Sequence, residues 1–249
     1  MSRRILLYVI GFVLVAGSAA LAVLPARWIM AALPSHLPLA VVNASGTIWS
    51  GTATVALGTP ERRRSVAEPV RWQFALDPGP RLRVSHPWLR GPVTLSLGWR
   101  GIGISAQTLQ LPATALGALD ARIAAIDPGG ELSLKWPATF IGLASRTAGA
   151  RLLDMEWRNA VSALAPVRPL GDYALALKQG APGQADVLLS TRQGPLMLNG
   201  AGILSRKQFQ FDGTAQADPS AGAEIRTALR DLLAALGPQQ NDVTLLRFR

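Results

Sequence analysis

The sequence predicts a mainly β fold, in which a single N-terminal transmembrane helix is followed by an extended antiparallel β-sheet domain with two amphipathic helices. Three observations predict it. An uncharged apolar run occupies residues 5–24. Beyond residue 40, apolar and polar residues alternate with a period of two, which is typical of strands with one buried face. Helical periodicity appears in only two later segments.

The run at 5–24 predicts a membrane anchor. As a helix its roughly 20 residues span about 30 Å, the thickness of the hydrocarbon core of a bilayer. Two arginines before the run favour a cytoplasmic tail at 1–4, while Arg27 and Trp28 after it suit the opposite interface. Residues 30–249 would then lie on the exported side of the membrane.

A cleavable signal peptide is the alternative. Ala20, Leu21 and Ala22 fit an A-x-A cleavage site. The apolar run is longer than the roughly 7–15 residues of a usual signal-peptide core and continues to the possible cleavage point, which favours a retained anchor. A mature chain that begins near Val23 would instead show cleavage.

The composition limits the available chemistry. The chain contains no cysteine, so it has no disulfides, thiolate nucleophiles or sulfur-ligated metals. Its net charge is +10, and nearly all of the cations are arginine. An exported basic domain would not meet nucleic acid, so anionic lipid headgroups or an acidic protein are the functional candidates. A GC-rich genome is the other explanation of the arginine content.

Alternation is clearest at apolar positions 70, 72, 74 and 76, at 82 and 84, and at 93, 95, 97 and 99. Later pairs at 187/189, 209/211 and 243/245 follow the same rule, and turns rich in Gly and Pro separate the segments. Arg71, Arg81, Arg83 and Arg100 fall between or after the apolar positions. We therefore expect these four to project together from the solvent side as a candidate interaction face.

Two helices are expected at 112–126 and 218–236. The first is stopped by the residues at 127–130. The second has Asp218 as its predicted N-cap, followed by a proline at the first helical position, and it is closed by Gly237. The segment at 127–130 is also the expected divide between two β-rich halves, 40–127 and 128–249.

The residues predict no catalytic, cofactor or metal site. His36 and His86 lack partners at metal-ligand spacing. Asp154 and Glu156 would share one face of a strand, as acid/base catalysts can, but arginines flank them and favour a solvated, salt-bridged surface. We therefore expect a protein that is not an enzyme.

The most distinctive motif is G-T-I-W-S-G at 46–51, formed by Gly46, Thr47, Trp49, Ser50 and Gly51 around Ile48. Paired glycines around a large aromatic residue predict a bulge or tight bend that places Trp49 in the core. We interpret the motif as structural.

With this motif, the chain resembles protein N of the bacterial type II secretion system (general secretion pathway protein N). The resemblance covers essentially the whole chain as an ordered series at 33–39, 46–51, 128–132, 157–160, 170–173, 194–200 and the final helix ending at 236–237. It implies an inner-membrane protein with a periplasmic β-rich body, an accessory part of the machinery that exports folded proteins across the outer membrane. It implies no active site.

Two functional hypotheses remain. An interaction protein would contact other secretion components through strand edges and its basic face. A lipid-handling module would hold acyl chains against a one-sidedly apolar sheet. A groove lined by Leu, Ile and Phe and open to solvent would favour lipid, whereas a filled core with bare strand edges would favour a protein partner.

Overall fold

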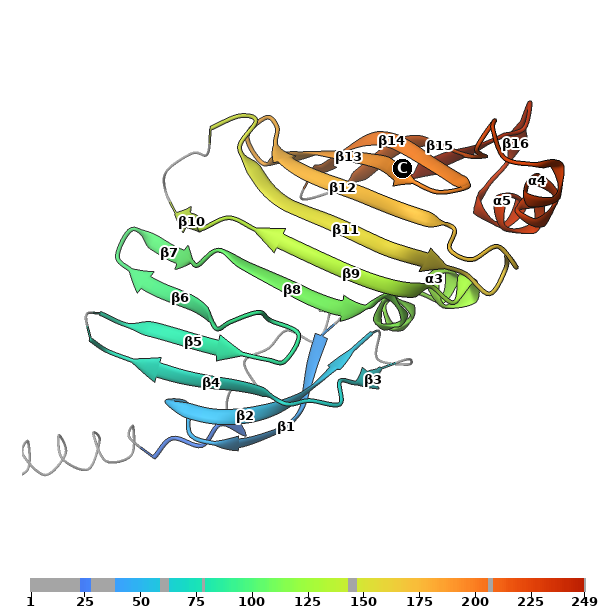
Figure 1. The fold of residues 1–249 in the computed structure, drawn as a ribbon. Helices are drawn as coiled ribbons and strands as arrows, with labels where there is room; N and C mark the ends of the chain where they lie inside the picture. Colours follow the sequence, from blue (N-terminus) through green and yellow to red (C-terminus); the bar gives the residue numbers. More distant parts are fainter. Residues whose placement is uncertain are drawn as a thin grey trace, which may run out of the picture.

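The structure is a computed structural model that describes residues 23–27, 39–58, 63–77, 79–142, 147–205 and 208–248. Within these residues the chain is mainly β, with antiparallel sheets and few helices, as predicted (Figure 1). No helix in these ranges is long and apolar enough to cross a membrane. The predicted anchor at 5–24 lies almost wholly outside the described residues, so it stays a prediction.

The first sheet has eight strands in the order β1-β2-β4-β5-β6-β7-β10, with β3 paired to β2. Neighbours in the sheet are mostly neighbours in sequence, as expected for strands joined by short Gly- and Pro-rich turns. The strands are β1 (Leu39–Gly46), β2 (Ser50–Leu57), β3 (Arg64–Ser65), β4 (Val70–Ala75), β5 (Arg81–Ser85), β6 (Val93–Gly98), β7 (Gly101–Ile104) and β10 (Thr139–Gly142).

The second sheet has nine strands in the order β16-β17-β15-β14-β13-β12-β11-β9-β8. They are β8 (Gln107–Pro112), β9 (Gly129–Trp136), β11 (Arg151–Val161), β12 (Gly171–Gln179), β13 (Gln184–Gln193), β14 (Leu196–Ser205), β15 (Phe209–Ala217), β16 (Gln239–Gln240) and β17 (Val243–Phe248).

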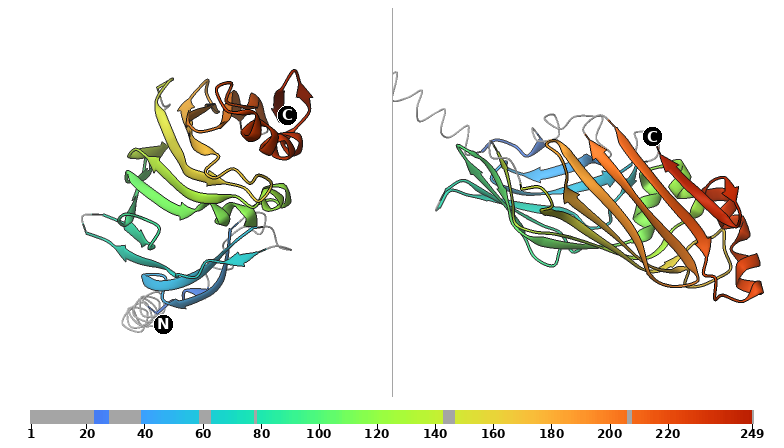
Figure 2. Two further views of the ribbon diagram at one scale, coloured as in Figure 1. Left: turned by 45° about the vertical axis from the view of Figure 1, so that its right-hand side comes forward. Right: turned by 90° about the horizontal axis from the view of Figure 1, so that it is seen from above.

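The two sheets are joined where β7 runs on into β8 and β9 runs on into β10. Thr139 pairs with Ile104 on one side of this junction, and Trp136 pairs with Gln107 on the other. At this junction the indole N–H of Trp136 donates to the carbonyl of Ser105, 3.0 Å away. The result is one long curved surface (Figures 1 and 2). The division into halves at residue 127 stays a prediction, although β8 and β9 pair across it.

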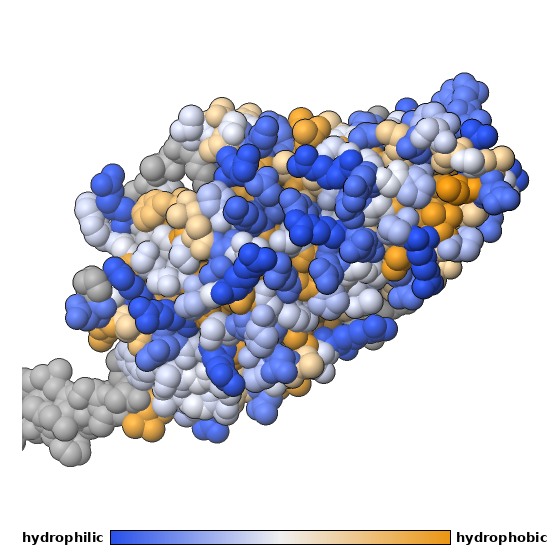
Figure 3. All heavy atoms as spheres, in the orientation of Figure 1, coloured by the Kyte–Doolittle hydropathy of each residue, from blue (hydrophilic) through white to orange (hydrophobic). Residues whose placement is uncertain are grey.

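Alternation gives this surface an apolar face and a polar face. The register places Phe74 opposite Leu82, and Leu82 opposite Leu95, in the first sheet. In the second sheet, Leu134 lies opposite Met155 on the same kind of face. Figure 3 shows the other face, on which hydrophilic side chains predominate over the central strands.

The helices lie at one end of the molecule (Figure 1). The segment expected as one helix at 112–126 is a 3-10 helix, η1 (Ala113–Ala118), followed by the short α3 (Ala121–Ile126). The segment expected at 218–236 forms α4 (Ala223–Ala228) and α5 (Arg230–Leu236).

The prediction that Asp218 is the N-cap of the second helix is wrong. Its carboxylate accepts hydrogen bonds from the backbone N–H and the hydroxyl of Ser220, at 2.8 and 2.7 Å. These bonds close a local turn of the kind that aspartate favours, and the helix begins only at Ala223. The same bonds lower the pKa of the Asp218 carboxyl.

The filled core lies under α4 and α5. Leu229 and Leu232 are almost fully buried against strand residues such as Tyr173 and Phe211. Away from the helices the apolar face is covered less. Its leucines at 95, 109, 134 and 175 are half-buried, and those near the opposite end, such as Leu97, are exposed.

Candidate functional site

The predicted basic face is assembled in part by the first sheet. Arg81 and Arg83 alternate along β5, and Arg71 on β4 lies opposite Ser85, so these three share the polar face. Arg100 lies instead in the turn between β6 and β7, where its guanidinium carbon is 5.7 Å from the centroid of the Trp99 ring. Among the described residues, the ion pairs involve none of these four arginines.

A hollow in the centre of the polar face of the second sheet extends the positive surface. It is lined by more cations than anions: Arg90, Lys135, Arg151, Arg158 and Arg192 against Asp154 and Glu156. Arg90, Lys135 and Arg192 were not predicted as site residues from the sequence. Lys135 and Arg192 occupy polar positions on β9 and β13, whereas Arg90 lies in the connection between β5 and β6 and donates its backbone N–H to the Thr108 carbonyl of β8 at 3.1 Å. Their meeting depends on the pairing of β8, β9, β11, β12 and β13.

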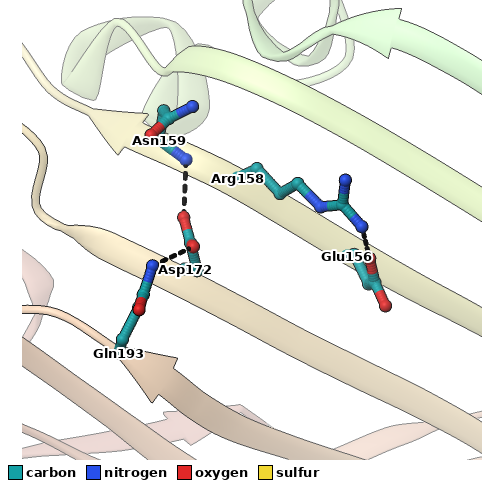
Figure 4. Close-up of polar contacts among 5 residues, drawn as sticks. All are labelled: Glu156, Arg158, Asn159, Asp172 and Gln193. Carbon is teal, nitrogen blue, oxygen red and sulfur yellow. Dashed lines mark hydrogen bonds and ion pairs between the residues drawn. The ribbon is translucent and has the colours of Figure 1, made fainter.

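The two carboxylates of this hollow are engaged with arginines. Arg151 lies 3.2 Å from the carboxylate of Asp154, and Arg158 lies 2.6 Å from that of Glu156 (Figure 4). All four side chains are substantially exposed to solvent, so each pair contributes little to stability, on the order of 0–1 kcal/mol. The arrangement is the salt-bridged surface expected from the sequence rather than an acid/base pair.

The histidine that the structure describes has a local structural role. The Nδ1 atom of His86 accepts the backbone N–H of Trp88 at 3.1 Å, which leaves its Nε2 to donate to the carbonyl of Glu68, also at 3.1 Å. His36 lies outside the described residues. Within the described ranges, no three His, Asp or Glu side chains are grouped so that they could hold a metal ion.

The 46–51 motif forms the turn between β1 and β2. The Thr47 hydroxyl accepts the backbone N–H groups of Trp49 and Ser50, each at 3.3 Å, and the Thr47 N–H donates to the Ser50 carbonyl at 2.9 Å. Trp49 is half-buried, with its ring edge-on to Phe74 at 5.3 Å between centroids. It therefore packs at the margin of the sheet rather than in the filled core.

Trp72 from β4 covers this turn, a contact that the sequence did not indicate. Its indole N–H lies 3.2 Å from the carbonyls of both Thr47 and Ile48. Its ring passes so close to Gly51 that a Cβ there would lie 2.5 Å from Trp72 Cζ2. The second glycine of the motif is therefore required both by the Ser45 carbonyl, which would lie closer still to a Cβ, and by the aromatic ring that lies over it.

The same turn holds the segment that follows the apolar run. Ala26 donates its N–H to the Gly46 carbonyl, and Ile48 donates to the Leu24 carbonyl, both at 3.0 Å. Ala26 is almost fully buried. The motif is thus the point at which residues 23–27 are fixed to the sheet.

Segments that carry the other family-like motifs meet at the helix-covered end of the second sheet. The Asp172 carboxylate accepts the backbone N–H of Asn159 and the side-chain amide of Gln193, each at 2.7 Å (Figure 4). The first bond fixes a break in register where β11 passes Asn159. At Gly194, φ is +124°, and a Cβ would collide with the backbone of Gly171.

Tyr173 stands at the centre of this arrangement. It is buried, and its hydroxyl lies 3.0 Å from the Leu196 carbonyl and 3.2 Å from the Leu170 carbonyl. Burial, with a smaller contribution from the negative charge of Asp172, raises the pKa of Tyr173. The phenol therefore stays protonated as a hydrogen-bond donor. These motifs hold the backbone together: the Asp172 carboxylate and the Tyr173 hydroxyl are both engaged in hydrogen bonds to neighbouring segments.

Taken with the fold, these surfaces define a class: an extended antiparallel β-sheet protein with one apolar face and one cationic face. The family model for protein N of the type II secretion system matches residues 38–246. The chain therefore belongs to that family, as the sequence motifs indicated, and family membership makes it an accessory component of type II secretion. No curated protein and no solved structure is significantly similar to the chain.

Proposed function

We propose that the protein is a non-enzymatic accessory component that is anchored in the bacterial inner membrane by residues 5–24 and tethers or stabilises the type II secretion machinery. Residues 30–249 would lie in the periplasm and act by binding other secretion components. The observation that carries the proposal is the family match over 38–246. The apolar run and its flanking arginines support the anchor.

The polar face supports binding as the mode of action. It presents arginines outside the ion pairs of the described residues on the first sheet, and a hollow with excess positive charge on the second. A surface of this charge fits an acidic protein segment, because complementary charge steers association and fixes register. Strand β1 at one margin of the surface also offers an edge for strand addition.

Deletion of the gene tests the role in secretion. We expect lower extracellular levels of folded exoproteins, their accumulation in the periplasm, and weaker co-purification of the remaining secretion components. Unchanged secretion together with unchanged co-purification would contradict the proposal. Restoration by a plasmid copy controls for effects on neighbouring genes.

The basic face gives a sharper test. Arg71, Arg81 and Arg83 are replaced together by glutamine, and Arg100 is added in a second variant because it lies in a turn. Folding should be nearly unchanged, since surface substitutions usually stay within about 0.5 kcal/mol. Association with the partner should weaken and lose its salt dependence. The control replaces three exposed arginines at the helix-covered end: Arg168, Arg226 and Arg230.

A lipid-handling role is the second candidate, and one observation favours it. The largest buried cluster on the apolar face lies where α4 and α5 cover it, while leucines across the central strands are half-buried and others near the far end are exposed. Acyl chains could lie against this open part of the face, because removing the apolar area of both the lipid and the leucines from water is favourable.

Site-specific photocrosslinking separates the two candidates. A photoreactive amino acid at Leu134 would face the apolar side of β9, whereas one at Lys135 would face the polar side. Lipid crosslinked at 134 and not at 135, with altered envelope lipids in the deletion strain and normal secretion, would favour lipid handling. Protein crosslinked at 135 alone would favour tethering.

A further inference from the structure

Exposed apolar side chains gather at the end of the sheet opposite α4 and α5. Trp99, in the β6–β7 turn, is 94% exposed, and Leu76, in the β4–β5 turn, is 67% exposed. Four more large apolar residues nearby are also exposed: Leu97, Ile102, Phe140 and Ile141. Single exposed leucines scattered over a surface are ordinary. A group of this size around an almost fully exposed tryptophan indicates a contact surface.

These residues lie on adjoining strands and turns at one end of the sheet, which we call the apolar tip, and Phe140 and Ile141 project from opposite faces of β10. In the pairing of β6, β7 and β10, Leu97 lies opposite Ile102, and Ile102 lies opposite Ile141. The β4–β5 turn is attached to the same tip, because the N–H of Leu97 donates to the carbonyl of Pro80 at 2.9 Å. The tip is therefore held by backbone hydrogen bonds from three strands and one turn.

Its chemistry matches the boundary between phospholipid headgroups and acyl chains. Tryptophan prefers this boundary because its ring is apolar while its N–H is polar. Arg100, stacked 5.7 Å from the Trp99 ring centroid, provides a cation for phosphate at the same level. Leu76, Phe140 and Ile141 supply the apolar area that would be removed from water.

The position of the tip points to the membrane. Leu24, the last residue of the predicted anchor, and Ala26 just after it are hydrogen-bonded to the β1–β2 turn. That turn is bonded to the end of β4, since the N–H of Phe74 donates to the Trp49 carbonyl at 2.6 Å. Figure 1 and the right-hand view of Figure 2 place residues 23–27, the β4–β5 and β6–β7 turns and the end of β10 at the same end of the molecule.

We propose that the apolar tip inserts into the headgroup region of the membrane that carries the anchor, as a second contact with the lipid. The proposal rests on the proposed anchoring by residues 5–24. Anchoring would hold the tip at a high effective concentration near the lipid, so even a small patch could stay inserted. The two contacts together would fix the tilt of the sheet relative to the membrane and direct its helix-covered end away from it.

The absence of cysteine allows a direct test with single introduced cysteines in the full chain. Trp99→Cys, Leu76→Cys and the control Ala235→Cys, at an exposed position of helix α5, are labelled with an environment-sensitive fluorophore. The proteins are reconstituted in liposomes that contain anionic phospholipid, and quenching by lipids nitroxide-labelled near the headgroup is measured. We expect severalfold stronger quenching and a blue-shifted emission at positions 76 and 99 than at 235.

The possible outcomes distinguish a failure of tip insertion from a failure of anchoring by residues 5–24. Labels at 76 and 99 that are quenched no more than the label at 235, in protein that stays with the liposomes after a carbonate wash, would overturn the proposal and leave a protein partner as the occupant. Loss of the whole chain in the wash would overturn the anchor instead. The Trp99→Cys variant lacks the tryptophan whose insertion is being tested. The label at position 76 therefore measures insertion of the tip with Trp99 still present. Adding Trp99→Ser to that variant should reduce the quenching at 76.

Discussion

Gly51→Ala is expected to destabilise the β1–β2 turn without removing any contact present in the native protein. The added Cβ would lie 2.5 Å from Trp72 Cζ2 and closer still to the Ser45 carbonyl, which belongs to the backbone and cannot rotate away. Overpacking of this kind typically costs about 1–3 kcal/mol. A shift of Trp72 would also lengthen its hydrogen bond to the Thr47 and Ile48 carbonyls, worth about 1 kcal/mol.

The expected total is about 2–4 kcal/mol, which for a domain of this size corresponds to a Tm lower by roughly 5–15 °C. Thermal unfolding of the full chain in detergent, followed by tryptophan fluorescence, measures it. Gly98→Ala is the matched control, because the nearest atom to its Cβ would be the Gly101 carbonyl oxygen at an ordinary 3.6 Å. A Gly51→Ala protein as stable as the Gly98→Ala protein would refute the role assigned to the Trp72 ring.

Three further substitutions test the other packing arguments by chemical denaturation. Trp49→Ala should cost about 2–3 kcal/mol, less than a fully buried tryptophan, because Trp49 is half-buried against Phe74; a stable variant that fails in secretion would make Trp49 a contact residue instead. Tyr173→Phe should cost about 1–2 kcal/mol at neutral pH. Because burial raises the pKa of Tyr173, its contribution is complete below the ordinary tyrosine pKa of about 10 and is lost as the pH rises above it, so the variant should lose less stability between pH 8 and 11 than the native protein. Asp172→Ala should cost about 1–3 kcal/mol because the backbone N–H of Asn159 loses its acceptor, and an unchanged unfolding midpoint would contradict that assignment.

The strands could be predicted from the sequence because their signal is local. A period of two at 70–76 or 93–99 needs no knowledge of the partner strand, and the structure places β4 and β6 there. The order of strands could be anticipated only where short turns join neighbours. The kinked continuation of β7 into β8, which joins the two sheets, depends on pairing with the later strands β9 and β10 and leaves no local pattern.

The errors have the same physical origin. Asp218 followed by proline satisfies the local rule for a helix start, yet the Ser220 N–H and hydroxyl compete for its carboxylate and delay the helix. Arg100 follows the alternation of β6 in sequence, but the strand ends at Gly98 and leaves it in a turn. The hollow that contains Arg90 and Arg192 could not be foreseen, because its members lie on strands and a connection that are distant in sequence.

The residues by which the family is recognised and the residues available for binding are largely separate. Gly51 and Thr47 shape a turn under Trp72, while Asp172 and Tyr173 fix the backbone beneath the helices. None of these groups presents a free reactive atom on the described surface, so a secretion defect caused by changing them would report misfolding. The cationic face and the apolar tip consist of exposed side chains on strands and turns whose backbone is already paired. Substitutions there are expected to leave the fold intact, and they are the ones that can show which surface meets the secretion machinery and which meets the membrane.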